Sequence, residues 1–278
     1  MFEKLLVVSD MSPSSDAIIR CLGNLKKYGA KECTLLQCIS TQEISSLAFS
    51  YSTSIIEHIL EDKKKTLEGL DFKVRTKIIS DFPKKVVNKI AVTGDYSIVV
   101  VGEIEHSRAG EMLFDRLTYG VIHTSEKPVL VIRLVMDEKK DYQKVRAVKY
   151  NIDDHILFPT DFSKNADHAF EYLKKMISDG IKKVTIMHVE EGPGSSSYEK
   201  LEVLKNKLSE YNDIKIDLVE DSGNPTKKIL EVVDEKNISL VVMGSQGKGF
   251  IKELFVGSVS HDIARHANAS VLLIPFSN

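Results

Sequence analysis

The chain carries the same sequence pattern twice, and this internal repeat limits the folds that it can adopt. The run LLVVSDMS at residues 5–12 matches ILFPTDFS at residues 156–163, because both are apolar and end in a polar residue, Asp, one further residue and Ser. Further along, VVVG at residues 99–102 matches VVMG at residues 241–244. Because solenoid repeats have periods of about 20–50 residues, so long a period indicates a duplicated domain.

The distance between matching residues shows where the two copies differ in length. From the match of Pro83 with Pro225 onward it stays at 142 residues without a gap, whereas Asp10 and Asp161 are 151 residues apart. The first copy therefore contains nine extra residues after its first strand, and we expect them within Thr41–Ser54.

The repeat also sets the domain boundaries. Two copies in 278 residues give domains at 1–134 and 154–278, in keeping with about 150 residues for a typical domain. Residues 135–153 are charged and show no apolar periodicity, so we expect a linker there.

Each copy alternates strand and helix patterns, which predicts an α/β fold. In the second copy, Ser163 precedes an apolar stripe at helical spacing, and Asn224-Pro225 is a typical helix start. We therefore expect two tandem Rossmann-like domains, each a five-stranded parallel sheet with helices on both faces. The strands of the second copy are expected at Ile156–Pro159, Val184–Val189, Ile214–Val219, Leu240–Met243 and Val271–Ile274.

The composition limits the classes of binding partner and the cellular compartment that we expect for this chain. With 38 basic and 40 acidic residues, the formal charge of −2 gives no reason to expect a nucleic acid or an anionic membrane as partner. No apolar run approaches the roughly 18 residues that span a bilayer, and MFEKLLVVSD lacks the long apolar segment of a secretion signal. Cys21, Cys33 and Cys38 form no disulfide framework or zinc motif, so we expect reduced thiols in a cytoplasmic protein.

The candidate site lies at the carboxyl ends of the strands, where open parallel sheets bind their ligands. In the second copy, Pro159-Thr160-Asp161 ends the first strand, and GSQGKGFIKELFVGSVS (residues 244–260) follows the fourth. Gly244 and Gly247 would let the backbone approach a bulky anion, and Gly257-Ser258 would open the last helix, where free N–H groups bind phosphate. Taken alone, the same glycines also fit a turn followed by an ordinary helix cap.

Other motifs that would define a site do not fit the sequence. Phe250 stands where a Walker-type phosphate loop needs Lys, and no Gly-x-Gly-x-x-Gly follows the first strand. No Gly-x-Ser-x-Gly elbow is present. His188 ends the second strand, but we expect none of the eight histidines to be catalytic or metal-bound.

In combination, these features resemble the universal stress protein (UspA-like) family in a tandem form with two domains. The resemblance rests on ILFPTDFS, VTIMHVEE, the GNP before the third helix, and GSQG…GSVS, and it covers nearly the whole chain. It implies a five-stranded fold of the adenine nucleotide alpha-hydrolase type, and many family members bind ATP or AMP. A magnesium ion would then be held through the phosphates and not by a dedicated protein site.

Carried over residue by residue, the resemblance places Asp161 at the nucleoside and the backbone of Val189 at the adenine. The glycines and Ser258 would hold the ribose and the phosphates. The full set that it implies is Pro159, Thr160, Asp161, Val189, Met243, Gly244, Gly247, Gly257, Ser258, Val259 and Ser260.

The first copy departs from this pattern. Glu105, Asp115 and Arg116 stand where the second copy has the second glycine, the third glycine and the serine, and only Gly102 and Asp10 are kept. Two carboxylates where phosphate should lie would repel it. We therefore expect a degenerate first domain and one functional nucleotide site, in the second.

The leading hypothesis is a cytosolic adenine-nucleotide-binding regulator of the stress response, whose output is a conformation or a partner contact. We name no catalytic residue, because no general base is evident. One alternative is slow ATP hydrolysis or self-phosphorylation at Ser258 or Ser260, and another is an interaction scaffold that binds no nucleotide. The resemblance also implies that the last strands, VLVIR and VLLIP, pair antiparallel within one chain, which leaves at most a weak homodimer.

Overall fold

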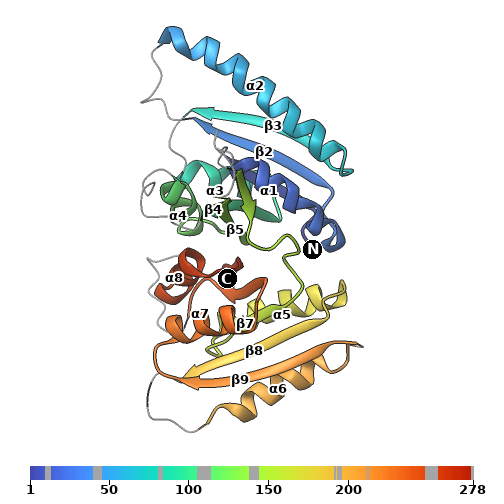
Figure 1. Cartoon of the computed structure of the whole chain (residues 1–278), viewed down its shortest axis with the longest axis vertical. Coiled ribbons are helices and arrows are strands. Elements are labelled where there is room, and N and C mark those ends of the chain that lie inside the picture. Colours follow the sequence, from blue (N-terminus) through green and yellow to red (C-terminus); the bar gives the residue numbers. More distant parts are fainter. Residues whose placement is uncertain are drawn as a thin grey trace. The chain divides into compact units, whose positions relative to one another are not determined.

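The structure, a computed structural model, divides the chain into two compact units (Figure 1). Unit 1 comprises residues 1–127 and 134–147, and unit 2 comprises residues 128–133 and 148–278. The residues that the structure describes are 1–9, 14–39, 46–80, 84–104, 114–137, 144–190, 192, 196–211, 213–247 and 256–276.

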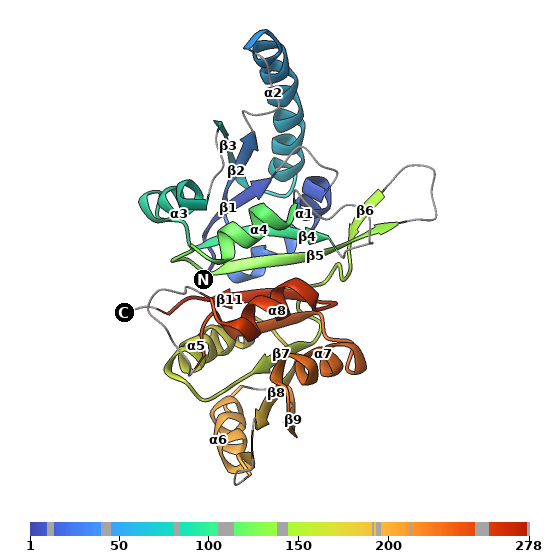
Figure 2. The same cartoon turned by 90° about the vertical axis from the view of Figure 1, so that its left-hand side faces the viewer.

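Unit 1 is built on four parallel strands in the order β3-β2-β1-β4 (Figure 2). The strands are β1 (Lys4–Ser9), β2 (Glu32–Ile39), β3 (Lys73–Ser80) and β4 (Ile98–Ile104). The helices are α1 (Ser14–Leu22), α2 (Ser46–Glu68), α3 (Lys84–Thr93) and α4 (Phe114–Ile122), with a short 3-10 helix at Gly23–Tyr28. Two further strands are β5 (Val129–Asp137), which crosses the unit boundary, and β6 (Lys144–Ala147).

Unit 2 repeats this order as β10-β7-β8-β9, with β11 beside β10, so all five predicted strands of the second copy are confirmed. In the same unit, residues 129–131 pair antiparallel with β11. The strands are β7 (Ile156–Pro159), β8 (Lys183–Glu190), β9 (Lys215–Ser222), β10 (Leu240–Gly244) and β11 (Ser270–Ile274). The helices are α5 (Lys164–Ser178), α6 (Tyr198–Leu208), α7 (Pro225–Glu235) and α8 (Ser258–His266).

The connections explain the two helical layers. In unit 1 the chain runs from β1 outward to β3 and then crosses back to β4, and right-handed crossovers in opposite directions place helices on opposite faces. Accordingly, α1 packs against α2, and α3 packs against α4. The predicted fold class, tandem α/β domains with largely parallel sheets, is thus confirmed.

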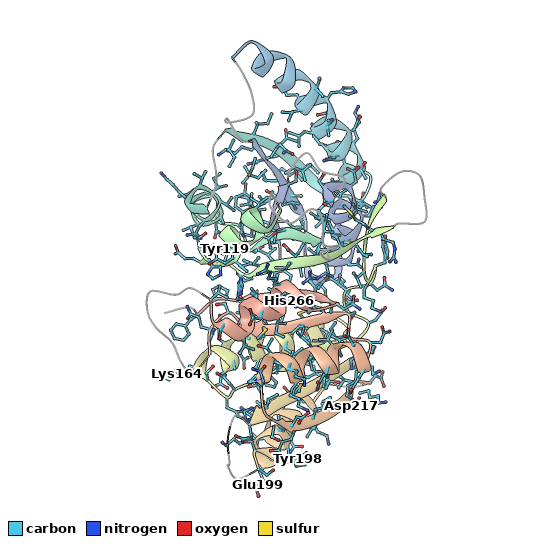
Figure 3. All side chains as sticks on the ribbon, turned by 60° about the vertical axis from the view of Figure 1, so that its left-hand side comes forward. Tyr119, Lys164, Tyr198, Glu199, Asp217 and His266 are labelled. Atoms are coloured by element: carbon cyan, nitrogen blue, oxygen red, sulfur yellow. The ribbon has the colours of Figure 1, made fainter. Side chains whose placement is uncertain are left out.

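Local signals in the sequence fix where the helices of unit 2 begin. The Oγ of Ser163 accepts a hydrogen bond from the Ala166 N–H at 3.2 Å, so Ser163 caps α5. The Oδ1 of Asn224 accepts one from the Lys227 N–H at 2.9 Å, with Pro225 at the first helical position of α7. Figure 3 labels Lys164 where α5 begins, Tyr198 where α6 begins and His266 where α8 ends.

Two features of the first copy differ in length or form from the second. Helix α2 has 23 residues, whereas its counterpart α6 has 11. The extra residues expected within Thr41–Ser54 therefore fall partly at the start of α2. Residues 40–45 lie outside the described part of the chain. The expected linker contains β6, which pairs antiparallel with residues 134–137 of β5. Among the helices described, none is long and apolar enough to cross a membrane.

Candidate functional site

The candidate site lies where the strand order of unit 2 reverses. Strands β7 and β10 are neighbours, but the chain leaves β7 toward β8 and leaves β10 toward β11. The two connections therefore diverge at the carboxyl ends and leave room for a ligand. Pro159 ends β7, Met243 and Gly244 end β10, and Val189 lies near the end of β8.

A tight turn presents Asp161 directly after β7. The Oγ1 of Thr160 accepts a hydrogen bond from the Phe162 N–H, and Oδ1 of Asp161 accepts one from the Ser163 N–H, both at 3.0 Å. Phe162 has a φ of 57°, which a residue other than glycine adopts only where its surroundings hold it. Because Ser163 and not Asp161 is the cap of α5, the carboxylate of Asp161 supports the turn through its bond to the Ser163 N–H.

The three motif glycines meet different steric demands. A Cβ at Gly244 would lie 2.8 Å from the Asn165 Nδ2 and 3.2 Å from the Asn165 backbone carbon, so glycine lets α5 approach β10. A Cβ at Gly247 would lie 2.8 Å from Oδ2 of Asp161, which brings two of the predicted site residues together. Among the residues that the structure describes, none lies closer than 3.7 Å to a Cβ at Gly257, and its φ of −74° suits any residue. The fold itself therefore does not require glycine at position 257.

Hydrogen bonds hold both ends of the segment that follows β10. The Gly257 N–H donates to the Ser245 carbonyl at 2.7 Å, and the Asn165 Nδ2 donates to the Gln246 carbonyl at 2.8 Å. Asn165 is buried, and its Oδ1 has no hydrogen-bond partner among the residues that the structure describes. Asn165 was not among the predicted site residues, because a lone Asn in the first turn of a helix gives no motif signal. The intervening residues 248–255 lie outside the described part.

Helix α8 begins without a side-chain cap. Its N-cap is Gly257, and the first helical bond runs from the His261 N–H to the Gly257 carbonyl at 2.9 Å. The N–H groups of Ser258, Val259 and Ser260 precede that bond and stand at the positive end of the helix dipole. This start of α8 has the features that bind an anion.

Burial separates the two candidate serines of α8. Ser258 is exposed, whereas Ser260 is buried and its Oγ donates to the Gly244 carbonyl at 3.0 Å. In unit 1, the Oγ1 of Thr118 makes the same bond to the Gly102 carbonyl at 3.0 Å. A hydroxyl at this position therefore joins helix to strand in both copies, and the ligand contact that the resemblance implies for Ser260 stays a prediction.

The matching region of unit 1 carries a buried carboxyl group. Glu103 corresponds to Ser245 and is 3% exposed. Asp115 and Arg116 fall in the first turn of α4, and their side chains are not described. Asp10 and Glu105 lie outside the described residues, so their predicted roles stay predictions.

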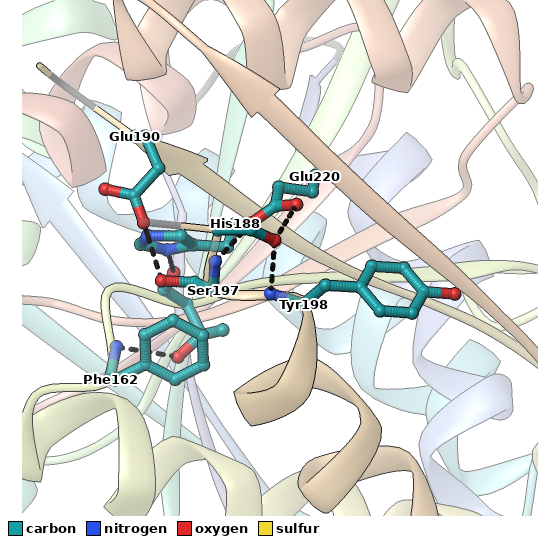
Figure 4. Close-up of polar contacts among 8 residues, drawn as sticks. Phe162, His188, Glu190, Ser197, Tyr198 and Glu220 are labelled. Carbon is teal, nitrogen blue, oxygen red and sulfur yellow. Dashed lines mark hydrogen bonds and ion pairs between the residues drawn. The ribbon is translucent and has the colours of Figure 1, made fainter. Parts of the chain in front are cut away.

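The end of β8 is held by the segment that starts α6 (Figure 4). The Oγ of Ser197 donates to Oε1 of Glu190 at 2.6 Å, and the Oγ of Ser196 donates to Oε2 of Glu220 on β9 at 2.7 Å. The hydrogen bond from Ser197, together with the nearby His188, holds the pKa of Glu190 below its usual value. Within the described residues, no group of histidine, cysteine and acidic side chains is placed to hold a metal ion.

The fold and repeat define a tandem α/β protein with a doubly wound, largely parallel sheet in each copy. The chain belongs to the universal stress protein family, whose model matches residues 1–133 and 154–275. These two matches fall on the two copies of the sequence repeat.

Individual relatives support the same assignment. The universal stress protein MJ0577 of Methanocaldococcus jannaschii is 26% identical over 154 residues, which cover 44% of this chain and 95% of that protein. A universal stress protein of Mycolicibacterium smegmatis is 24% identical over 292 residues, covering 97% of this chain and 96% of its own. The crystal structure of a universal stress protein from Archaeoglobus fulgidus DSM 4304 matches with a TM-score of 0.78 and 25% identity, over 97% of this chain and 95% of that one. The last two matches extend along both copies.

Proposed function

We propose that unit 2 binds one adenine nucleotide, ATP or AMP, and that the chain is a nucleotide-dependent regulatory protein of the stress response. The observation that carries this proposal is the uncapped start of α8, at Gly257, in a fold whose ligands bind at the carboxyl ends of the strands. Membership of the universal stress protein family supports it.

The described contacts suggest a role for each part of the site. The phosphates would lie at the N–H groups of Ser258–Ser260, where the exposed Ser258 hydroxyl offers a further donor. Asp161, which the turn after β7 places at the carboxyl end of that strand, would accept a hydrogen bond from the nucleoside. The backbone of Val189 would face the adenine, and any magnesium ion would be held by the phosphates.

The experiment is to identify and count the nucleotide. Mass spectrometry of small molecules released from the purified chain should find ATP or AMP, and calorimetry of the emptied chain should give one site. Two equivalent sites would contradict the proposed asymmetry. If no nucleotide co-purifies and calorimetry detects no binding of ATP or AMP, the interaction scaffold that binds no nucleotide becomes the better interpretation.

Self-phosphorylation remains the second candidate function, because Ser258 is exposed beside the proposed phosphate site while Ser260 is buried. If it occurs, incubation with ATP and magnesium should modify Ser258 alone, and released ADP should match the phosphoserine formed. Phosphate on Ser260 would contradict this assignment.

We also propose that the two copies associate within the chain through their last strands. The support is the antiparallel pairing of residues 129–131, which belong to the first sequence copy, with β11 inside unit 2. Val131→Pro removes a backbone donor from this ladder and should expand the chain in solution scattering. Val131→Ile is the control that keeps the donor. An unchanged scattering profile for Val131→Pro would refute the association.

We place the protein in the cytoplasm, because its cysteines are free. Burial raises the pKa of Cys21 to about 11 and that of Cys33 to about 12, so both thiols stay protonated and inert at neutral pH.

A further inference from the structure

The His188 side chain links two segments of the proposed site. It lies at the end of β8, is buried, and its ring packs on that of Phe162 with centroids 4.5 Å apart. Its Nδ1 lies 2.6 Å from the Thr160 carbonyl oxygen, and its Nε2 lies 3.3 Å from Oε1 of Glu190 (Figure 4). Thr160 precedes Asp161 in the tight turn, and His188 itself precedes Val189.

Both ring nitrogens therefore face oxygen atoms that can only accept a hydrogen bond. A neutral imidazole carries one N–H and one lone pair, so it can satisfy either the carbonyl of Thr160 or the carboxylate of Glu190. The imidazolium carries two N–H groups and satisfies both. The lowered pKa of Glu190 keeps that acceptor ionised across the range in which imidazoles titrate.

Within the described part of the chain, the other charged groups near the ring come from β9, α6 and the turn after β7. On β9, Glu220 is the register partner of His188 and is engaged by Ser196. On α6, the ammonium of Lys200 lies 5.3 Å from the centroid of the Phe162 ring. The turn after β7 presents the uncharged carbonyl of Thr160 and carries Asp161. Among these groups, Glu190 is the charged group in direct contact with the ring.

We propose that His188 is a positioning residue: as an imidazolium it ties the turn at Thr160–Asp161 to Glu190, and nucleotide affinity falls when the ring loses its second proton. This inference rests on the proposed function, because the turn holds Asp161 and the next residue is Val189. It adds to that function a dependence on intracellular pH. The residue orients the site and makes no contact with the nucleotide.

The first copy supplies a matched substitution. Gln37 corresponds to His188, is 1% exposed, and accepts a hydrogen bond from the Ser9 Oγ at 3.0 Å. Its Nε2 donates to the Cys38 carbonyl at 3.2 Å. An amide thus fits this place in the fold and links the first two strands without titrating. His188→Gln should therefore keep the fold of unit 2 and remove its response to pH.

The test is the Kd for ATP of the full chain and of His188→Gln, measured by calorimetry at about pH 5.5 and about pH 8.5. At each pH, the Kd of the wild type is divided by the Kd of the variant. This ratio removes the effect of ATP ionisation, because that effect is the same for both proteins. As pH rises, the wild type should lose about three- to tenfold in affinity relative to the variant. Glu190→Gln, which removes the charged acceptor, should flatten the profile in the same way. A ratio that stays constant with pH would overturn the proposal.

A second measurement separates this inference from the proposed function. If neither protein binds ATP at either pH, the nucleotide site itself is refuted. The positioning role is then decided by NMR, where the amide resonances of Phe162 and Ser163 should follow the titration of the His188 ring. These resonances should stay constant in His188→Gln. Amides that do not respond to pH in the wild type would overturn the positioning role as well.

Discussion

The two copies of the repeat differ in how they connect the fourth strand to the last helix. In unit 2, β10 ends at Gly244 and α8 begins at Ser258, so thirteen positions, 245–257, separate the two elements. In unit 1, β4 continues two residues past the matching Gly102, and α4 begins at Phe114, two residues before the position that matches Ser258. In the first copy, residues at the matching positions therefore lengthen β4 and α4. Glu103, in the added part of β4, is buried.

What the copies share is equally informative. Gly102 and Gly244 both admit a neighbouring helix, since a Cβ would lie 2.7 Å from Ile18 in one copy and 2.8 Å from Asn165 in the other. Thr118 and Ser260 make the same bond to those glycines. These two shared contacts therefore serve the fold, whereas the proposed phosphate site of unit 2 falls at Gly257 and Ser258, where the copies differ.

The largest effect is expected from Gly257→Asp, which copies the charge of Asp115 into the proposed phosphate site. The matched control is Gly257→Asn, because both side chains can cap α8 and only one is charged. ATP affinity should fall at least about a hundredfold for Asp and much less for Asn, with thermal stability kept in both. Equal affinities for the two variants, measured by calorimetry, would mean that no phosphate lies at this helix start.

A smaller effect is expected from Asp161→Ala, which removes the proposed nucleoside contact. Affinity for ATP should fall about tenfold, because a hydrogen bond to a carboxylate is lost, while the free energy of unfolding changes little. Ser163→Ala is the control, since loss of the α5 cap should cost about 1 kcal/mol of stability and leave affinity unchanged. If Asp161→Ala lowers stability and keeps affinity, the carboxylate serves only the turn.

The smallest effect is expected from removing the hydrogen bond between helix and strand that both copies share. Ser260→Ala and Thr118→Ala each remove one buried hydrogen bond, and each should cost its own unit about 1 kcal/mol. Hydrogen exchange followed by mass spectrometry reports the two units separately, and ATP affinity should stay within about twofold for both variants. A Ser260→Ala protein that loses ATP binding with unchanged exchange would restore the ligand contact implied by the family resemblance.

Local patterns predicted much of the architecture. The caps Ser163 and Asn224 and the helix start at Gly257 were found because each depends on the residue type at one position and on its immediate neighbours. The strands of unit 2 were found because a sheet covered on both faces requires continuous apolar runs. Because the two copies match in sequence, the same elements were then predicted at the matching positions of the first copy.

Features that depend on tertiary contacts were not predicted. Strand β6 was not predicted because, of residues 145–147, only Val145 is buried. One buried residue is too few to show the alternation of buried and exposed positions that indicates a strand. The bond from Asn165 to Gln246 joins segments far apart in sequence. The burial of Glu103 contradicts the usual preference of carboxylates for water, so a pattern of residue types does not reveal it.

The open space at Gly257 has a consequence for how such a site is lost during evolution. Because none of the described residues lies within 3.7 Å of an added Cβ there, a charged side chain meets no steric obstacle among them. A duplicated gene could therefore lose the proposed phosphate site in a single mutation and keep a folded domain. Gly244 lacks this freedom, because an added Cβ would lie 3.2 Å from the backbone of α5, and at its counterpart Gly102 an added Cβ would meet the side chains of Ile18 and Leu134.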